Sequence, residues 1–225
     1  MIKREIQNSI LADFKRKKVI VLLGARQVGK TTLLLSLQSD KERVLSLNCD
    51  NIDDRLLLEA RTSTELKYLL SSYDMVFIDE AQRVKNIGLT LKMIGDLKLD
   101  TQIVVTGSSS FDMANEINEP ATGRLIEYNL YPFSLAELAA DTSEREEKRL
   151  LENRLIYGLY PEVVTEPADA KRTLMSLTNN YLYKDLFSYK GLKKPDVIQK
   201  LVRALALQLG SEVSYNELSN LLGID

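Results

Sequence analysis

The sequence predicts an α/β fold built on a parallel β-sheet. Two observations carry this prediction. Short runs rich in Val, Ile, Leu and Phe recur as far as Leu130, and stretches with helical patterns separate them. Strands that alternate with helices form parallel sheets that are covered on both faces. The five expected strands are Val19–Leu23, Arg43–Asn48, Met75–Asp79, Gln102–Thr106 and Glu127–Leu130.

Expected helices fill the gaps between these strands and dominate the chain beyond Pro132. The first group is Arg4–Arg16, Thr31–Gln38, Asp54–Tyr73, Ile87–Leu97 and Phe111–Ile117. The second group is Leu135–Ala140, Ser143–Leu159, Ala168–Phe187, Asp196–Gly210 and Tyr215–Leu222. The lysine-rich stretch Tyr189–Pro195 has the composition of a linker. We therefore expect an α/β core over residues 1–134, a helical region over 135–190 and a third part over 191–225.

Composition removes several classes of function. The chain has no histidine, which excludes His-based acid–base catalysis, Ser–His triads and His-ligated zinc. Its one cysteine, Cys49, cannot form an internal disulfide, and we expect it to be a small buried residue. A net charge of -2 gives no overall field that would attract nucleic acid or an acidic membrane. Without a signal peptide or a membrane span, a cytoplasmic location is expected.

The strongest motif is GARQVGKT, which fits the pattern G-x-x-x-x-G-K-[ST] in full and lies between a strand and a helix. Its glycines let the backbone curl so that successive N–H groups point at phosphate oxygens, and the start of the following helix adds positive potential. Lys30 can then reach the β- and γ-phosphates of ATP, and the Thr31 hydroxyl can ligate Mg²⁺. The residues expected to hold ATP are Gly24, Ala25, Arg26, Gln27, Val28, Gly29, Lys30, Thr31 and Thr32.

A second motif is the apolar run MVFI, which closes on two acids, Asp79 and Glu80. Open α/β sheets bind ligands at the carboxyl ends of their strands, where these acids would lie. We expect Asp79 to hold Mg²⁺ through a coordinated water. Glu80 is expected to polarise the water that attacks the γ-phosphate.

Two further residues are candidates for catalysis. The strand Gln102–Thr106 leads into a Gly-Ser turn, and Ser108 is favoured there over Thr106 and Ser109 as a sensor of the γ-phosphate. The alternative is a solvated turn that caps the next helix. Arg124 precedes the fifth strand and is either an arginine finger directed at a neighbour's γ-phosphate or a surface arginine paired with acids of its own domain.

At this point the sequence resembles a known family. The segments GARQVGKTTLL, NCDN, VFIDEAQ, VVTGSSS and ATGRLIEYNLYPFSLAEL occur in an order similar to that of prokaryotic AAA+ ATPases with an uncharacterised C-terminal domain. The later segments GLYPEVV, NNYLYKDLF and VSYNELSNLLGID also resemble that family. The resemblance therefore covers nearly the whole chain.

The resemblance implies a five-stranded P-loop NTPase sheet of order 5-1-4-3-2, with helices on both faces. It implies Lys30 and Thr31 in the first Walker motif, Asp79 and Glu80 in the second, Ser108 as the first sensor and Arg124 as a finger or sensor. Serines stand where many AAA+ relatives have Asn at the sensor. It further implies that residues 191–225 start a winged-helix-like unit, and that the chain stops ahead of a further C-terminal domain.

The function expected from these motifs is Mg²⁺-dependent ATP hydrolysis that drives a conformational change in an attached or partner domain. One alternative is a nucleotide-held switch or scaffold with little turnover. Another is a DNA-associated ATPase, for which Lys193, Lys194, Lys200 and Arg203 supply some positive charge. A small-molecule kinase is less favoured because Ser134–Phe187 lacks a dense arginine cluster. The expected partners are ATP, a second copy of the chain with Arg124 acting in trans, and a protein partner.

Overall fold

The computed structural model describes residues 1–38, 43–108, 123–182 and 195–223. The chain divides into two compact units, Met1–Ala170 and Lys171–Asp225. Each unit is described below by itself. The domain boundaries expected from composition, after residues 134 and 190, stay a prediction. None of the described helices is long and apolar enough to cross a membrane.

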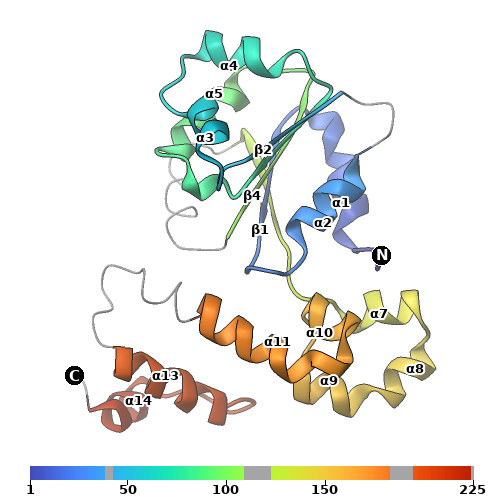
Figure 1. The fold of residues 1–225 in the computed structure, drawn as a ribbon, viewed down its shortest axis with the longest axis vertical. Coiled ribbons are helices and arrows are strands. Elements are labelled where there is room, and N and C mark those ends of the chain that lie inside the picture. Colours follow the sequence, from blue (N-terminus) through green and yellow to red (C-terminus); the bar gives the residue numbers. More distant parts are fainter. Residues whose placement is uncertain (39–42, 109–122, 183–194, 224–225) are drawn as a thin grey trace. The chain divides into compact units, whose positions relative to one another are not determined.

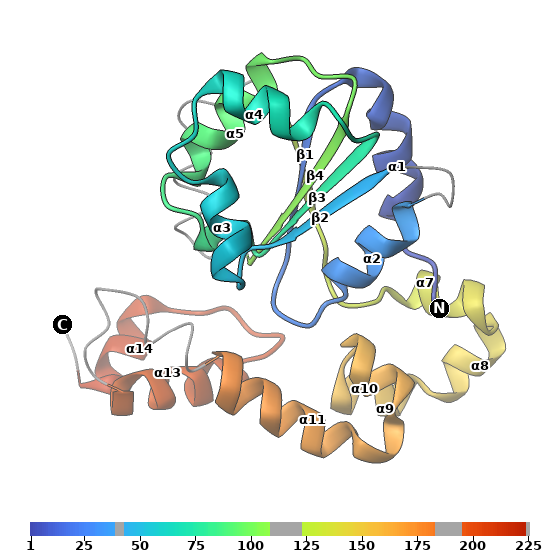
Figure 2. The ribbon, with the colours of Figure 1, turned by 45° about the horizontal axis from the view of Figure 1, so that its top comes forward.

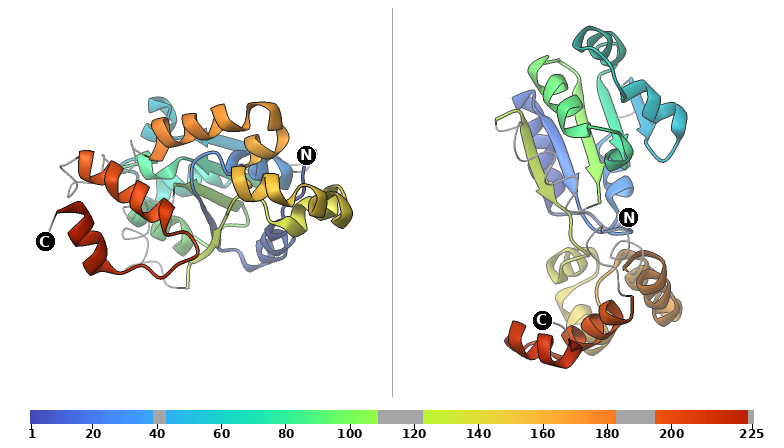
Figure 3. Two further views of the ribbon diagram at one scale, coloured as in Figure 1. Left: turned by 90° about the horizontal axis from the view of Figure 1, so that it is seen from below. Right: turned by 90° about the vertical axis from the view of Figure 1, so that its left-hand side faces the viewer.

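The first unit contains a five-stranded sheet in the order β2-β3-β4-β1-β5, and every neighbouring pair is parallel. The order can be followed by colour in the right-hand view of Figure 3. The predicted order 5-1-4-3-2 and the predicted α/β class are both confirmed. The strands are β1 (Val19–Leu23), β2 (Val44–Asn48), β3 (Met75–Asp79), β4 (Gln102–Gly107) and β5 (Leu125–Asn129).

Burial along the strands follows their place in the sheet. Every residue of β1 is buried, and β3 and β4 are buried except at one end. These strands are continuous runs of Val, Ile, Leu and Phe because helices cover both faces. The edge strands β2 and β5 are only partly buried and carry polar residues. Because the strands are parallel, their carboxyl ends lie on the same side of the sheet. The residues that follow β1, β3 and β4 therefore lie close together there.

Helices pack on both faces of the sheet (Figures 1 and 2). On one face, α1 (Ile6–Asp13) and α2 (Lys30–Leu37) bury a cluster that includes Ile10, Leu33 and Leu34. On the other face lie α3 (Ile52–Leu58), α4 (Ser63–Leu70) and α5 (Ile87–Asp96). Their apolar side chains form the second core cluster with β1, β3 and β4. Short 3₁₀ helices follow α1 (Phe14–Arg16) and β3 (Ala81–Arg83).

The single helix expected over Asp54–Tyr73 was wrong, because the chain forms α3 and α4 with a break between them. Ala60 at the break adopts a left-handed conformation with φ of 51°. Thr62 then caps α4 in a reciprocal capping box with Glu65. These local bonds give the backbone a new helix start, although the leucine spacing alone favours continuity.

The helical pattern after β5 is confirmed, but Ser143–Leu159 also forms two helices, which meet at Leu150. The helices of this part of the first unit are α7 (Leu135–Asp141), α8 (Glu144–Arg149), α9 (Leu151–Tyr157), α10 (Pro161–Thr165) and the 3₁₀ helix Pro167–Asp169. Ser134 and Glu137 form a capping box at the start of α7. The helix expected over Phe111–Ile117 lies outside the described residues.

The second unit consists of helices joined by turns in its described part. It contains α11 (Ala170–Leu177, whose first residue ends the first unit), the π-helix Thr178–Leu182, α13 (Pro195–Leu207) and α14 (Tyr215–Leu222). Ser214 caps α14 by accepting a hydrogen bond from the Glu217 N–H. A winged-helix-like unit at this end of the chain stays a prediction.

Candidate nucleotide site

The Gly-rich loop connects β1 to α2 and has the backbone that its sequence requires. The Gly24 N–H donates to the Gly107 carbonyl at 3.3 Å, which joins the loop to the end of β4. A Cβ on Gly24 would lie 2.5 Å from the Leu130 carbonyl oxygen, so no larger residue fits without movement. Gln27 and Gly29 both adopt positive φ values, of 61° and 94°. The loop therefore curls tightly onto the start of α2 at Lys30.

Lys30 lies inside this curl. Its side chain is buried, and its Nζ donates to the carbonyls of Gly24 at 3.0 Å and Ala25 at 3.1 Å. An ammonium group has three donors and keeps a strong preference for oxygen partners, which the loop supplies from its own backbone. Phosphate oxygens are acceptors of the same kind for these donors. Thr31 and Thr32 occupy the exposed first turn of α2.

Topology brings Asp79 to this loop, although 48 positions separate it from Thr31. Asp79 ends β3, and its Oδ2 accepts a hydrogen bond from the Thr31 hydroxyl at 2.8 Å. Its Oδ1 accepts a hydrogen bond from the Thr106 hydroxyl. These oxygens are hard ligands of the kind that Mg²⁺ prefers beside substrate phosphates. The residues present therefore fit a Mg²⁺ site.

Glu80 follows Asp79 and is held by two neighbouring segments. Its φ of 54° places it in the left-handed region, and its N–H donates to the Thr106 hydroxyl at 3.2 Å. Its Oε2 accepts a hydrogen bond from Gln82 Nε2 at 2.5 Å. Gln82 Oε1 in turn accepts from the Ser108 N–H at 3.3 Å. The Glu80 carboxylate is thus connected through one amide side chain to the end of β4.

Gln82 was not expected as a site residue, although it stands in the VFIDEAQ segment. It reaches Glu80 because a 3₁₀ helix, Ala81–Arg83, follows β3 directly. Thr106 was ranked below Ser108, yet Thr106 is the residue that hydrogen bonds Asp79 and the Glu80 amide. Ser108 is buried at the end of β4. A sensing role for Ser108 stays a prediction, and Ser109 lies outside the described residues.

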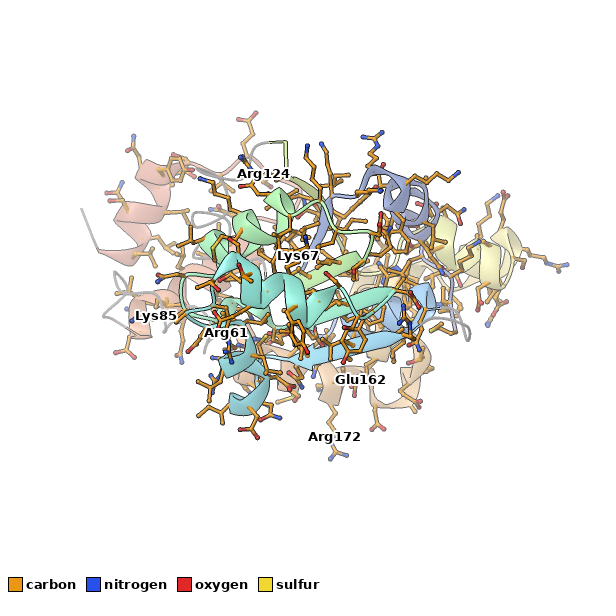
Figure 4. All side chains as sticks on the ribbon, turned by 90° about the horizontal axis from the view of Figure 1, so that it is seen from above. Arg61, Lys67, Lys85, Arg124, Glu162 and Arg172 are labelled. Carbon is orange, nitrogen blue, oxygen red and sulfur yellow. The ribbon has the colours of Figure 1, made fainter. Side chains whose placement is uncertain are left out.

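Arg124 lies at the opposite end of the sheet from the phosphate loop. Its carbonyl accepts from the Val19 N–H at 3.3 Å, at the start of β1, whereas the loop follows the end of β1 at Leu23. Five strand residues separate these two ends, which is roughly 16 Å. Its guanidinium forms an ion pair with Asp96 of α5, and Figure 4 shows Arg124 beside that helix. This placement leaves Arg124 out of the site of its own chain; a role in trans stays a prediction.

Cys49 lies beside the acidic strand end without belonging to the phosphate site. It is fully buried, and its N–H donates to the Asp79 carbonyl at 2.9 Å. Burial raises the pKa of the Cys49 thiol to about 12, and the charges of Asp54 and Asp79 add to the rise. The thiol is therefore neutral at physiological pH and acts as a small apolar residue.

A cavity of about 530 Å³ opens next to the loop. Gly29 and Thr32 line it on the loop side, Gln7 and Met1 on the N-terminal side, and Pro161 on the side of α10. Cavities of 300–1,000 Å³ commonly hold small molecules. The chain therefore offers a recess that is contiguous with the start of α2.

A buried arginine, Arg4, forms one wall of this cavity and was also missed. Its guanidinium pairs with Glu137 at 3.0 Å and lies 4.7 Å from the centre of the Phe133 ring. It also donates to the Val28 carbonyl of the loop at 3.0 Å. The sequence placed Arg4 only at the start of a packed helix, because its partners are far away along the chain.

Comparison with known proteins agrees with this geometry. Residues 16–139 match the family described as AAA domain, which is more than half of the chain. The chain belongs to this AAA domain family. Residues 148–225 match a second family, described as Domain of unknown function (DUF8612). The predicted AAA+ relationship is thereby confirmed, and the second match agrees with the expected C-terminal region of unknown function.

Matches to two curated relatives cover nearly the whole chain. An uncharacterized protein of Haemophilus influenzae is 28% identical over 241 residues, covering 99% of this chain and 60% of the relative. The uncharacterized protein MJ1637 of Methanocaldococcus jannaschii is 25% identical over 268 residues, covering 100% of this chain and 55% of the relative. This AAA protein thus spans little more than half the length of these relatives.

A solved structure has the same fold. The Walker-type ATPase PABY2304 of Pyrococcus abyssi superposes with a TM-score of 0.56 at 16% identity. The alignment covers 99% of this chain and 88% of that one. At this identity the likeness bears on the fold alone, and the fold is that of a P-loop ATPase.

Proposed function

We propose that this AAA protein binds ATP with Mg²⁺ and hydrolyses it to ADP and phosphate. One observation carries the proposal: the Thr31 hydroxyl and the Asp79 carboxylate are hydrogen bonded at 2.8 Å beside a buried Lys30, and Glu80 follows Asp79 directly. Phosphoryl transfer to water needs a phosphate cradle, oxygen ligands for a metal and a group that orients the water. These residues supply all three within one edge of the sheet.

The loop residues 24–29 and the first turn of α2 bind the phosphates in this proposal. Backbone N–H groups donate to the β-phosphate, and the start of α2 favours its negative charge. Lys30 releases the carbonyls of Gly24 and Ala25 and donates to β- and γ-phosphate oxygens. The base and ribose lie in the adjoining cavity, beside Thr32 and Gln7.

Thr31 and Asp79 hold the metal side of the site. Mg²⁺ supplies positive charge that stabilises the negative charge developing on the phosphate oxygens. The Thr31 hydroxyl oxygen would ligate the metal through a lone pair while its O–H still donates to Asp79. Thr106 keeps the Asp79 carboxylate oriented from the β4 side.

Glu80 orients the attacking water and accepts its proton at a carboxylate oxygen. The water oxygen forms a bond to the γ-phosphorus while the bond from that phosphorus to the β,γ-bridging oxygen breaks. Gln82 holds the carboxylate through its amide until a water takes over part of that contact. Because Glu80 accepts the proton, a side chain of the same shape that cannot be protonated removes catalysis and leaves binding intact.

A nucleotide-held switch with little turnover is the second candidate. It is favoured by the position of Arg124, at the end of the sheet away from the phosphate loop of its own chain. An arginine finger accelerates many P-loop enzymes by 10³–10⁵, and a single copy of this chain does not place Arg124 at its own γ-phosphate. Hydrolysis would then wait for a partner, and the bound ATP would act as a signal to the attached domain.

Glu80→Gln separates these proposals in a phosphate-release assay at saturating ATP and Mg²⁺. The variant is expected to bind ATP as the wild type does and to lose about 100-fold or more of the turnover. Glu59→Gln is the matched control, because Glu59 is a carboxylate of the same unit outside the phosphate site. Equal turnover in wild type and Glu80→Gln would overturn the catalytic role. Binding without turnover in the wild type would favour the switch.

A further inference from the structure

Arg4 is a buried charge that the proposed chemistry does not use. Its side chain is 8% exposed and that of its partner Glu137 is 6% exposed. A buried ion pair adds little stability over a well-packed apolar pair, because both ions lose their water. The stability of the fold therefore does not by itself account for an arginine at this position.

The guanidinium gathers two segments that are distant in sequence. On one side it donates to the Val28 carbonyl in the phosphate loop at 3.0 Å. On the other it donates to the carbonyls of Tyr131 and Pro132, the latter at 3.4 Å, in the segment that leads from β5 to α7. Arginine suits this task because its planar group presents five donors in a fixed fork.

Glu137 fixes the guanidinium in turn. Its Oε1 accepts from Arg4 Nε at 3.0 Å and from the Glu5 N–H at 2.9 Å, while its Oε2 accepts from the Ser134 N–H at 3.0 Å. The carboxylate that caps α7 thus also holds Arg4. The guanidinium that contacts the loop is therefore itself hydrogen bonded to the residue that caps α7.

The Val28 contact determines the orientation of the peptide bond that joins Val28 to Gly29. A trans peptide is planar, and its C=O and N–H point in opposite directions. When the carbonyl is held against Arg4, the Gly29 N–H faces away from Arg4, as a donor to phosphate in the loop interior must. Gly29 has φ of 94°, a conformation that glycine adopts without a Cβ penalty, and the bond from Arg4 favours this orientation of the peptide.

We propose that Arg4 is a positioning residue of the phosphate site, which fixes the Val28–Gly29 peptide so that its N–H is directed at the β-phosphate. The inference rests on the proposed function, since it assumes that the loop binds a nucleotide. It adds that the β-phosphate site is completed by an N-terminal residue and by α7, outside the loop itself.

The test compares the affinities for ADP and AMP by titration calorimetry, because AMP lacks the phosphate that the loop cradles. Arg4→Met removes the fork, and Arg4→Lys keeps a charge beside Glu137 without the fork. Glu137→Gln keeps one acceptor oxygen of the two that Glu137 uses and removes the negative charge. The double variant Arg4→Met/Glu137→Gln leaves no buried ion unpaired. Arg16→Met is the control, because Arg16 is 65% exposed.

The ratio of ADP to AMP affinity is expected to fall about tenfold or more in each variant that lacks Arg4, including the double variant. AMP serves as the reference because it also reports any change in the cavity wall that Arg4 forms. Glu137→Gln is expected to lower the melting temperature and to lower the ratio of ADP to AMP affinity by less than the Arg4 variants do, because Arg4 keeps its bond to the Val28 carbonyl but loses its charged partner. If Arg4→Met does not fold, Arg4→Lys takes its place. A ratio of ADP to AMP affinity equal to that of the wild type, in folded Arg4→Lys or in the double variant, would overturn the inference. Failure of the wild type to bind either nucleotide would instead overturn the proposed function, and this inference with it.

Discussion

Among single residues, Gln82 has the contact with the clearest consequence for turnover. It links the Glu80 carboxylate to the end of β4 through hydrogen bonds of 2.5 Å and 3.3 Å. A carboxylate that acts on water must be held in one orientation, because misplacement of a reacting group costs rate. The position of this glutamine therefore bears on catalysis although it has no acid–base chemistry of its own.

Gln82→Met is expected to lower kcat by about tenfold and to leave the KM for ATP within about twofold, because it removes an orienting bond and no phosphate contact. Steady-state kinetics over a range of ATP concentrations measures both quantities. Gln102→Met is the matched control, since Gln102 begins β4 at the far end of the sheet. A rise in KM with an unchanged kcat would contradict the orienting role.

The residues found from sequence and those missed differ in the range of their contacts. Lys30, Thr31, Asp79 and Glu80 stand in local motifs, and local patterns report them directly. Arg4 contacts a residue 133 positions away, and no periodicity marks that pairing. The roles of all these residues at a bound nucleotide stay predictions.

At the scale of elements, the family resemblance implied the sheet order that the structure has, and the apolar runs predicted the strands, whereas helix ends could not be predicted. The apolar runs of β1 and β3 are continuous because both faces are covered, and such runs are plain in a sequence. The break between α3 and α4 depends on one left-handed residue, Ala60, and one capping box. Leucines on both sides favour a continuous helix, so the leucine pattern does not predict the break.

Thr62→Ala is expected to destabilise the protein by about 1 kcal/mol, because it removes the side chain that caps α4. Denaturant unfolding measures the change, and Thr62→Ser serves as the control because it retains the hydroxyl. Unfolding free energies that are equal for the alanine variant and the wild type would mean that the capping box adds nothing to α4.

A second prediction concerns the contact between β5 and α1. The Tyr128 hydroxyl donates to Asp13 at 2.7 Å, and burial together with this bond raises the pKa of Tyr128 to about 12. A raised folded-state pKa gives stability that is complete below the unfolded value, about 10, and is lost as the pH rises toward 12. Wild type is therefore expected to lose stability over this range more steeply than Tyr128→Phe. Parallel pH profiles of unfolding would contradict this assignment.

At the scale of the whole molecule, the unanswered question is what the nucleotide acts on. The chain covers 60% and 55% of the length of two curated relatives. An action of the nucleotide on a partner domain is therefore a proposal. Lys200 and Arg203 of α13 are exposed and leave DNA as one such proposal, while Lys193 and Lys194 lie outside the described residues. Arg124 is the described residue whose position most directly suggests a second copy of the chain.

Mixing two inactive variants tests that suggestion. Arg124→Ala keeps Glu80, and Glu80→Gln keeps Arg124. If Arg124 acts in trans, each variant alone is expected to lose at least about tenfold in turnover, and an equimolar mixture regains part of it. Asp96→Asn is the control, because it breaks the ion pair and leaves Arg124 in place. No recovery in the mixture would contradict a role for Arg124 in trans.

The central claim is that the loop before α2 binds the phosphates of ATP, and the most direct measurement is ATP binding by titration calorimetry with Mg²⁺. The wild type is expected to bind, Lys30→Ala to bind at least about tenfold more weakly, and the exposed-lysine control Lys15→Ala to bind as the wild type does. An affinity in Lys30→Ala equal to that of the wild type, or no binding by the folded wild type, would contradict the account.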